Sequence, residues 1–105
     1  MPAPSLSAPY TLEPVTYNLN DDADAETFLA LNREVGETFT SNQPGFLHRE
    51  IGKNDDGTWL IAVFWNTSED ARNSIANIDS IPDVVKSYMA MINRETLKRD
   101  IFDIV

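Results

Sequence analysis

The sequence predicts an α+β domain with the ferredoxin-like split βαβ arrangement, in which helices cover one face of a four-stranded antiparallel sheet. The predicted elements follow one another in the order strand, helix, strand, strand, helix, strand over 105 residues. The central stretch 59–65 is a run of seven apolar residues, which favours a strand, whereas 28–39 and 71–92 repeat apolar residues at helical spacing. This order is that of a two-layer α+β domain.

A length of 105 residues is that of one domain. We expect residues 11–105 to form it, because residues 1–10 carry three prolines among small side chains and suit an extended arm. A hydrophobic fraction of 42% is ordinary for a globular protein, and no apolar run approaches the ~20 residues that a membrane span needs. The start of the chain has neither the basic residues nor the long apolar core of a secretory signal, so a cytoplasmic location is expected.

The formal net charge of −9 makes nucleic acid and anionic membranes poor partners, because their phosphate groups would be repelled. The chain contains no cysteine, which excludes disulfides, thiolate catalysis and cysteine-based zinc sites. Any self-association must therefore rest on apolar contacts that are strong enough to outweigh charge repulsion.

The first strand is expected at 15–20, with a late start because Pro14 cannot donate a hydrogen bond to a neighbouring strand. Three aspartates follow it, and we interpret them as caps because acidic side chains favour the positive N-terminal end of a helix. A calcium loop is the alternative, but the glycine and the terminal glutamate of such a loop are missing at the required offsets. The aspartates are Asp21, Asp22 and Asp24, and the apolar stripe of the helix is Phe28, Leu29, Leu31, Val35 and Phe39.

The second strand, 46–53, and the third, 59–65, are expected to form a hairpin. Pro44 and Gly45 end the preceding helix, and the connecting loop closes with Gly57, which can adopt the left-handed conformation that such a turn needs.

Both faces of the third strand are apolar. Because side chains alternate along a strand, Trp59, Ile61, Val63 and Trp65 face one way, and Leu60, Ala62 and Phe64 face the other. One face can meet the helices of the same chain. We expect the other to be covered by the sheet of a second copy, in a homodimer, because each large side chain left in water would forgo ~1.5–3 kcal/mol.

After the third strand, Asn66 or Thr67 can cap a helix that begins near Glu69 and Asp70. The triplet 66–68 also spells a glycosylation acceptor, but the cap is favoured since no secretory signal is expected. The helical pattern includes Ala71, Ile75 and Ile78 and restarts at Pro82, with Val84, Val85, Tyr88, Met89 and Ile92 on its apolar side. The last strand is expected at 96–105.

Three short motifs stand around the second and third strands. They are Pro44-Gly45-Phe46-Leu47, Asp56-Gly57-Thr58-Trp59, and Val63-Phe64-Trp65 followed by Thr67-Ser68-Glu69-Asp70-Ala71. In these motifs, and in the order of elements from 12 to 105, the chain resembles the antibiotic biosynthesis monooxygenase family of the dimeric α+β barrel superfamily. The resemblance implies a homodimer in which two sheets close into a barrel.

Some members of that family oxidise polycyclic quinone precursors with oxygen and no cofactor, and others degrade haem. The haem-degrading members use an asparagine on the first strand, and a tryptophan and a histidine on the helices after the third strand. Asn18 or Asn20 could fill the first role, but residues 66–91 contain neither tryptophan nor histidine. The resemblance therefore points away from haem degradation.

His48 is the only histidine and lies in the second strand, where its side chain must point into one of the two layers. An imidazole titrates near neutral pH, so His48 could act as a catalytic base toward a phenolic substrate; it could equally be a hydrogen-bonded residue of the sheet. Glu50 shares its face by alternation and could orient the imidazole or pair with Arg49 or Lys53.

Flat and polarizable side chains could line a pocket for a planar aromatic ligand. Trp59 and Trp65 share one face of the third strand and could line it with Tyr88, Met89 and Met91, although such residues also fill ordinary cores. Tyr88 is the second candidate catalytic residue, because a buried hydroxyl must find a partner and could donate to a substrate oxygen. The candidate substrate-binding residues are Trp59, Trp65, Glu50 and Met89.

Glycine-rich phosphate loops, nucleophile elbows and metal-ligand clusters are absent from the sequence, so no nicotinamide, flavin or metal cofactor is expected. We hypothesise a cofactor-independent monooxygenase that acts on a small aromatic or quinol substrate. The alternative is a non-catalytic ligand-binding or interaction protein with the same dimeric fold.

Overall fold

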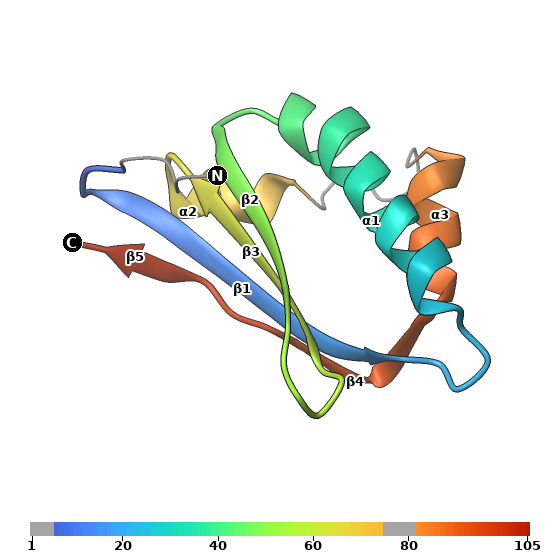
Figure 1. Ribbon diagram of the computed structural model, residues 1–105. Helices are drawn as coiled ribbons and strands as arrows, with labels where there is room; N and C mark the ends of the chain where they lie inside the picture. Colours follow the sequence, from blue (N-terminus) through green and yellow to red (C-terminus); the bar gives the residue numbers. More distant parts are fainter. Residues whose placement is uncertain (1–5, 75–81) are drawn as a thin grey trace.

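The computed structural model describes residues 6–74 and 82–105. The strands pair antiparallel in the order β2-β3-β1-β4. Strand β5 also pairs with β1, on the same side as β4 and farther along β1. Helices α1 and α3 lie side by side over one face of this sheet (Figure 1). The predicted ferredoxin-like α+β fold is confirmed. The elements are β1 (Tyr10–Leu19), α1 (Ala25–Thr38), the 3₁₀ turn η1 (Thr40–Asn42), β2 (Phe46–Lys53), β3 (Trp59–Trp65), α2 (Ser68–Asn73), α3 (Asp83–Ala90), β4 (Ile92–Arg99) and β5 (Phe102–Ile104).

Strand β1 begins at Tyr10, earlier than the predicted start at Val15. The prediction was wrong because Pro14 lies within a central strand, at a point where no partner strand needs a hydrogen bond from its missing N–H. On one side Pro14 pairs with β3, but on the other side the ladder changes from β4 to β5, and the Pro14 carbonyl accepts a hydrogen bond from the Asp100 N–H at 3.1 Å. The N–H and C=O of a strand residue point to the same side, so the missing donor faces this break.

The C-terminal segment forms two strands instead of the single strand predicted at 96–105. Asp100 separates them: its carboxylate accepts a hydrogen bond from the Ile101 N–H at 2.9 Å, which turns the chain locally. Pairing with β1 then resumes at Phe102.

Strand β4 begins at Ile92, which helical spacing had assigned to the preceding helix. Helix α3 ends before the predicted residue because Asn20 donates hydrogen bonds to the carbonyl groups at its end. The Asn20 side-chain amide donates to the Ala90 carbonyl at 3.0 Å, and its backbone N–H donates to the Met91 carbonyl at 2.9 Å. This tertiary contact overrides the local spacing.

Two of the predicted helix caps, Asp24 and Thr67, are confirmed. The Asp24 carboxylate accepts a hydrogen bond from the Thr27 N–H at 2.9 Å, and the Thr67 hydroxyl accepts one from the Asp70 N–H at 3.1 Å. Gly57 has a φ of 83°, the left-handed conformation expected in the hairpin loop. Ile75 and Ile78, which the sequence placed in the second helix, lie outside the described residues. Among the residues described, no helix is both long and apolar enough to cross a membrane.

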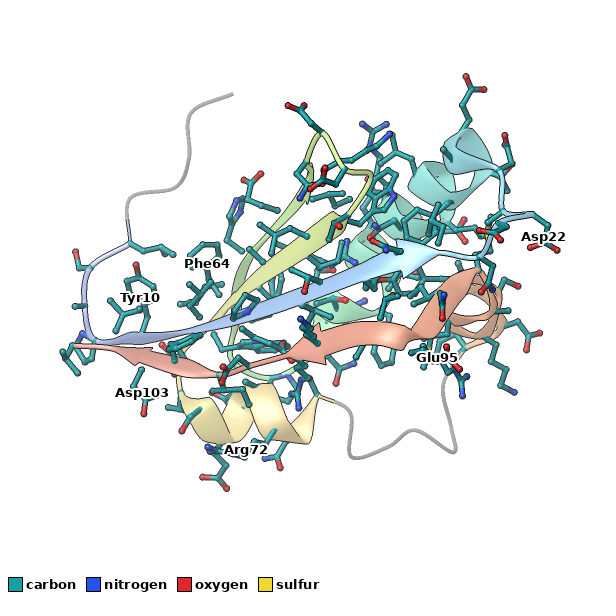
Figure 2. All side chains as sticks on the ribbon, turned by 90° about the horizontal axis from the view of Figure 1, so that it is seen from below. Tyr10, Asp22, Phe64, Arg72, Glu95 and Asp103 are labelled. Carbon is teal, nitrogen blue, oxygen red and sulfur yellow. The ribbon has the colours of Figure 1, made fainter. Side chains whose placement is uncertain are left out.

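The two faces of the sheet differ in burial. The face under the helices carries the core, which includes Tyr17, Phe28, Trp59, Ile61, Val63 and Trp65. The opposite face is open and carries exposed apolar side chains: Leu60 is 38% exposed and Phe102 is 50% exposed. Tyr10 and Phe64 lie beside each other on this face, with ring centroids 5.9 Å apart (Figure 2). The alternation predicted for β3 therefore separates a buried face from an open one.

Candidate functional site

A cavity of about 420 Å³ lies between the sheet and the helices. This size is within the range of small-molecule sites. Its wall is mostly apolar and is formed by residues of β1, β3 and α3, among them Val15, Ile61, Val63, Trp65 and Met89. Polar and charged side chains also line it, among them Tyr17, Tyr88, Arg49 and Glu13, and they determine which polar groups of a ligand can bind there.

Arg49 reaches the cavity because of a β-bulge at the start of β2. Phe46 lies opposite Trp65, and Leu47 would be expected opposite Phe64. His48 lies opposite Phe64 instead, so β2 has one extra residue here. Since side chains alternate, this extra residue moves the rest of β2 to the other face of the sheet. The bulge therefore turns Arg49 toward α1 and the cavity, and turns His48 to the opposite face of the sheet.

The Arg49 guanidinium is held by neutral groups. It donates to the backbone carbonyl of Asn32 at 2.9 Å and to the Asn32 side-chain oxygen at 2.6 Å. Asn32 is fully buried on α1, and its Nδ2 has no hydrogen-bond partner among the described residues. Burial lowers the pKa of Arg49, while Tyr88 and Tyr17 nearby oppose the fall. A guanidinium stays charged in proteins, so the cavity wall carries a cation in a fixed orientation.

The hydroxyl groups of Tyr17 and Tyr88 share a hydrogen bond of 2.6 Å. Phe28 packs against both rings, stacked on Tyr88 at 5.4 Å and edge-on to Tyr17 at 5.8 Å. Burial raises the pKa of both hydroxyls; for Tyr88, its bond to Tyr17 and the nearby Arg49 charge oppose the rise. Both tyrosines therefore stay protonated near neutral pH, where they can donate hydrogen bonds but cannot act as bases.

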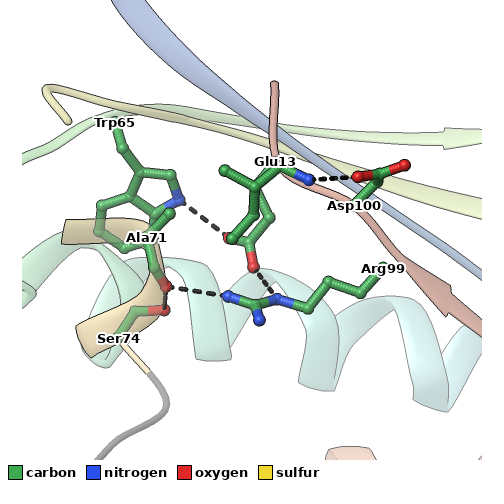
Figure 3. Close-up of polar contacts among 7 residues, drawn as sticks. Glu13, Trp65, Ala71, Ser74, Arg99 and Asp100 are labelled. Atoms are coloured by element: carbon green, nitrogen blue, oxygen red, sulfur yellow. Dashed lines mark hydrogen bonds and ion pairs between the residues drawn. The ribbon is translucent and has the colours of Figure 1, made fainter. Parts of the chain in front are cut away.

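A second polar group lies where the cavity meets α2. The buried Glu13 carboxylate accepts a hydrogen bond from the Trp65 indole N–H at 2.9 Å and forms an ion pair with Arg99 (Figure 3). Arg99 also donates to the Ala71 carbonyl at 2.9 Å. These contacts fix the indole ring and tie β4 to α2, so the charge of Glu13 is already compensated within the chain.

Three of the predicted site residues line this cavity: Tyr88, Met89 and Trp65. Trp59 does not line it. Its ring is packed edge-on against Phe28 at 5.0 Å, in the core under α1. Trp59 is therefore a core residue, which was the alternative to a ligand-binding role.

His48 and Glu50 lie on the open face of the sheet, away from Tyr88. Their shared face, predicted from alternation, is confirmed, and the His48 Nε2 contacts the Glu50 carboxylate. The His48 ring lies 5.8 Å from the Phe64 ring, and His48 borders a different pocket at the edge of β2. The geometry therefore gives no support to His48 as a base, or to Glu50 as a contact, for a ligand held beside Tyr88.

Several polar residues of the cavity region were missed from the sequence. Asn32 offered a signal, because it interrupts the apolar stripe between Phe28 and Val35 at helical spacing. Arg49 offered none, since its place depends on the bulge. Glu13, Tyr17 and Arg99 are recognised only through partners that are distant in the sequence.

Neither asparagine weighed for a haem site lines the cavity. The Asn18 side chain accepts a hydrogen bond from the Thr58 hydroxyl at 3.0 Å, and Asn20 is engaged at the end of α3. Within residues 6–74 and 82–105, no group of three histidine, cysteine or acidic side chains could hold a metal ion.

The chain has the fold of the antibiotic biosynthesis monooxygenase structures. SnoaB, a cofactor-independent oxygenase from Streptomyces nogalater, matches with a TM-score of 0.72 at 14% identity, over 93% of this chain and 95% of that chain. A candidate antibiotic biosynthesis monooxygenase from Bordetella bronchiseptica matches with a TM-score of 0.75 at 12% identity, over 93% and 99%. Another, from Nitrosomonas europaea, gives 0.69 at 15%, over 96% and 95%. The predicted resemblance is thus confirmed in the fold.

No protein-family model matches the sequence, and no curated protein does. The likeness is therefore one of structure, and the chemistry must be argued from the residues of the cavity.

Proposed function

We propose that this chain is a cofactor-independent monooxygenase that oxidises a small aromatic or quinol substrate in the cavity between sheet and helices. The observation that carries the proposal is a fixed cation, Arg49, beside two protonated hydroxyls, Tyr17 and Tyr88, on the wall of a mostly apolar cavity. SnoaB, which shares the fold, is a cofactor-independent oxygenase, and this supports the proposal.

The substrate would bind with one oxygen toward Arg49 and Tyr88. Ionisation of a phenol or enol places negative charge on that oxygen, and a preorganised cation and hydroxyl donor would stabilise it. The apolar wall, with Trp65 and Met89, would hold flat rings. Because the cavity is mostly apolar, these electrostatic contacts would be stronger than in water.

The oxidation needs no external reductant. With a hydroxyanthrone, loss of one proton to solvent would leave an ionised ring system, which would give up electrons to O₂. The peroxide formed at its methylene carbon would take one proton back from solvent and become a hydroperoxide. Loss of water from the hydroperoxide then leaves a ketone at that carbon. One oxygen atom of O₂ ends in the ketone and the other in water, so the substrate supplies all four electrons that reduce O₂.

We also propose that a second copy of the chain covers the open face of the sheet. The apolar side chains on that face include Leu60 at 38% exposure and Phe102 at 50%. Burial of each such side chain against a partner would contribute ~1.5–3 kcal/mol. A two-fold contact would bury the same side chains of both copies, which doubles the gain.

Oxygen consumption with 1,8-dihydroxyanthrone tests the proposed reaction. Purified protein treated with a chelator should consume one O₂ per substrate faster than the spontaneous oxidation, and ¹⁸O₂ should place one labelled atom in the anthraquinone product. A rate equal to the spontaneous one would contradict the proposal. If the product-like 1,8-dihydroxyanthraquinone nevertheless bound in the cavity, the non-catalytic ligand-binding function would be favoured.

A further inference from the structure

Helix α1 carries two residues on one face that each reduce the stability of the fold. Asn32 is fully buried, and its side-chain Nδ2 has no hydrogen-bond partner within 6–74 and 82–105. Gly36 follows four positions later, one helical turn along the same face. A buried donor without a partner and a glycine inside a helix are both destabilising. The two unfavourable residues have one neighbour in common, which is Arg49.

Asn32 and Gly36 together form a seat for the Arg49 side chain. The guanidinium donates to the Asn32 backbone carbonyl at 2.9 Å and to the Asn32 side-chain oxygen at 2.6 Å. A Cβ atom added to Gly36 would lie only 2.8 Å from Nη1 of Arg49 and 3.2 Å from its Cδ. Asn32 therefore fixes the guanidinium, and Gly36 leaves the space that it occupies beside the cavity.

The seat is neutral where a charged residue of the same shape would fit. An aspartate at position 32 would bind the guanidinium through a stronger, charge-assisted hydrogen bond and would carry no unpartnered N–H. Arg99 shows this other arrangement in the same cavity, since it forms an ion pair with Glu13. Arg49 takes part in no ion pair among the residues that the structure describes. The asparagine thus holds the arginine without compensating its charge.

We propose that Asn32 is a positioning residue for the proposed reaction: its neutral side chain fixes the Arg49 guanidinium against α1 and leaves the positive charge available to the substrate oxygen. The inference rests on the proposed function and deepens it, because it identifies what keeps the Arg49 charge uncompensated. Asn32 is not among the described residues that line the cavity, so it acts through Arg49 and does not touch the substrate.

Ionisation of a bound dye measures the Arg49 charge without any oxidation. 2-Hydroxyanthraquinone changes colour when its hydroxyl ionises, so absorbance against pH gives the pKa of the bound dye. A positive charge beside the hydroxyl lowers this pKa by about 1–3. The pKa of the bound dye should therefore be lower in the wild type than in Arg49→Gln. Asn32→Asp, which compensates the charge, should raise it to the Arg49→Gln value.

Asn18→Asp is the matched control. It makes the same replacement at an exposed residue outside the cavity and keeps the oxygen that accepts the hydrogen bond from Thr58. The pKa of the bound dye should stay at the wild-type value in this variant. In the oxidation of 1,8-dihydroxyanthrone, Asn32→Asp should lower kcat about 100-fold, as Arg49→Gln does, but should cause no further loss when it is added to Arg49→Gln.

Asn32→Ala separates the charge from the contact, and it decides the matter alone if Asn32→Asp does not fold. Alanine is neutral and leaves only the backbone hydrogen bond to Arg49. The pKa of the bound dye should therefore rise in this variant, but by less than in Asn32→Asp.

A wild-type pKa of the bound dye in either Asn32 variant would overturn the inference. So would a larger rise with alanine than with aspartate, and so would failure of the wild type to bind the dye. Oxidation is measured separately. The expected dye response without oxidation would retain the role of Asn32 and remove the proposed reaction; oxidation without the dye response would do the reverse.

Discussion

The hydroxyl oxygens of Tyr17 and Tyr88 lie 2.6 Å apart, although the residues belong to β1 and α3 and are 71 positions apart in the sequence. Their bond joins the sheet to the helical layer on the wall of the cavity. The Arg49 charge affects the pKa of both hydroxyls, so the three side chains form one electrostatic unit. Packing of the two layers and the polar site are therefore coupled.

Removal of one hydroxyl should leave the other unpaired. Tyr88→Phe is expected to lower the free energy of unfolding by about 1–3 kcal/mol, because the buried Tyr17 hydroxyl loses its partner. Tyr17→Phe should have a similar effect. The double variant should be destabilised by less than the sum of the two, since neither hydroxyl remains unpaired. Urea denaturation of the wild type and the three variants measures this coupling, and strictly additive losses would contradict it.

Stability should fall as the pH rises above the ordinary tyrosine pKa of about 10. Burial raises the pKa of Tyr17 and Tyr88 in the folded protein, so the unfolded chain releases these protons first. The free energy of unfolding that the two hydroxyls contribute is complete below the tyrosine pKa of the unfolded chain. Above that pKa it falls by up to ~1.4 kcal/mol per pH unit for each tyrosine. Urea denaturation from about pH 8 to about pH 11 should show a shallower fall for the double phenylalanine variant. Equal slopes would contradict this assignment.

Gly45 and Gly57 form a matched pair, with φ angles of 80° and 83°. Alanine at Gly57 should cost about 1 kcal/mol for the left-handed conformation alone, because nothing lies within 4 Å of the added Cβ. At Gly45 the added Cβ would come within 2.1 Å of the Asp70 carboxylate, so Asp70 must also move. Gly45→Ala should therefore be clearly more destabilising in urea denaturation. An equal decrease in the free energy of unfolding for the two variants would contradict this expectation and show that Asp70 can move at no cost.

Signals from residues close together in the sequence predicted most of the fold. Asp24 caps its helix, Gly57 turns the hairpin, and the alternation along 59–65 separates the two faces of the sheet. Each depends on a few neighbouring residues whose physical preferences agree. The order of elements that follows from them was sufficient for the sheet topology.

The polar site could not be predicted in the same way. A single extra residue near Leu47 decides whether His48 or Arg49 faces the cavity, and alternation counted from Phe46 without the bulge would have favoured His48. Glu13 and Arg99, which are 86 positions apart, meet only in the folded chain. The sequence therefore did not predict the place of a residue wherever register or tertiary pairing decides it.

Association through the open face can be tested with two leucines of similar exposure. Leu60 is 38% exposed on the open face, and Leu97 is 41% exposed on the side of the cavity. Leu60→Asp should weaken a two-fold dimer about 100-fold or more, since it places two charges in one apolar contact. Leu97→Asp should leave association unchanged. Sedimentation at micromolar concentration measures both, and a wild-type monomer would contradict the proposed dimer.

The most direct test compares Arg49→Gln with His48→Gln in the oxidation of 1,8-dihydroxyanthrone. The two residues are adjacent in the sequence but lie on opposite faces of the sheet. If Arg49 stabilises the substrate anion in the cavity, Arg49→Gln should lower kcat about 100-fold, and His48→Gln should leave it near the wild-type value. Loss of activity in His48→Gln with activity retained in Arg49→Gln would contradict the account.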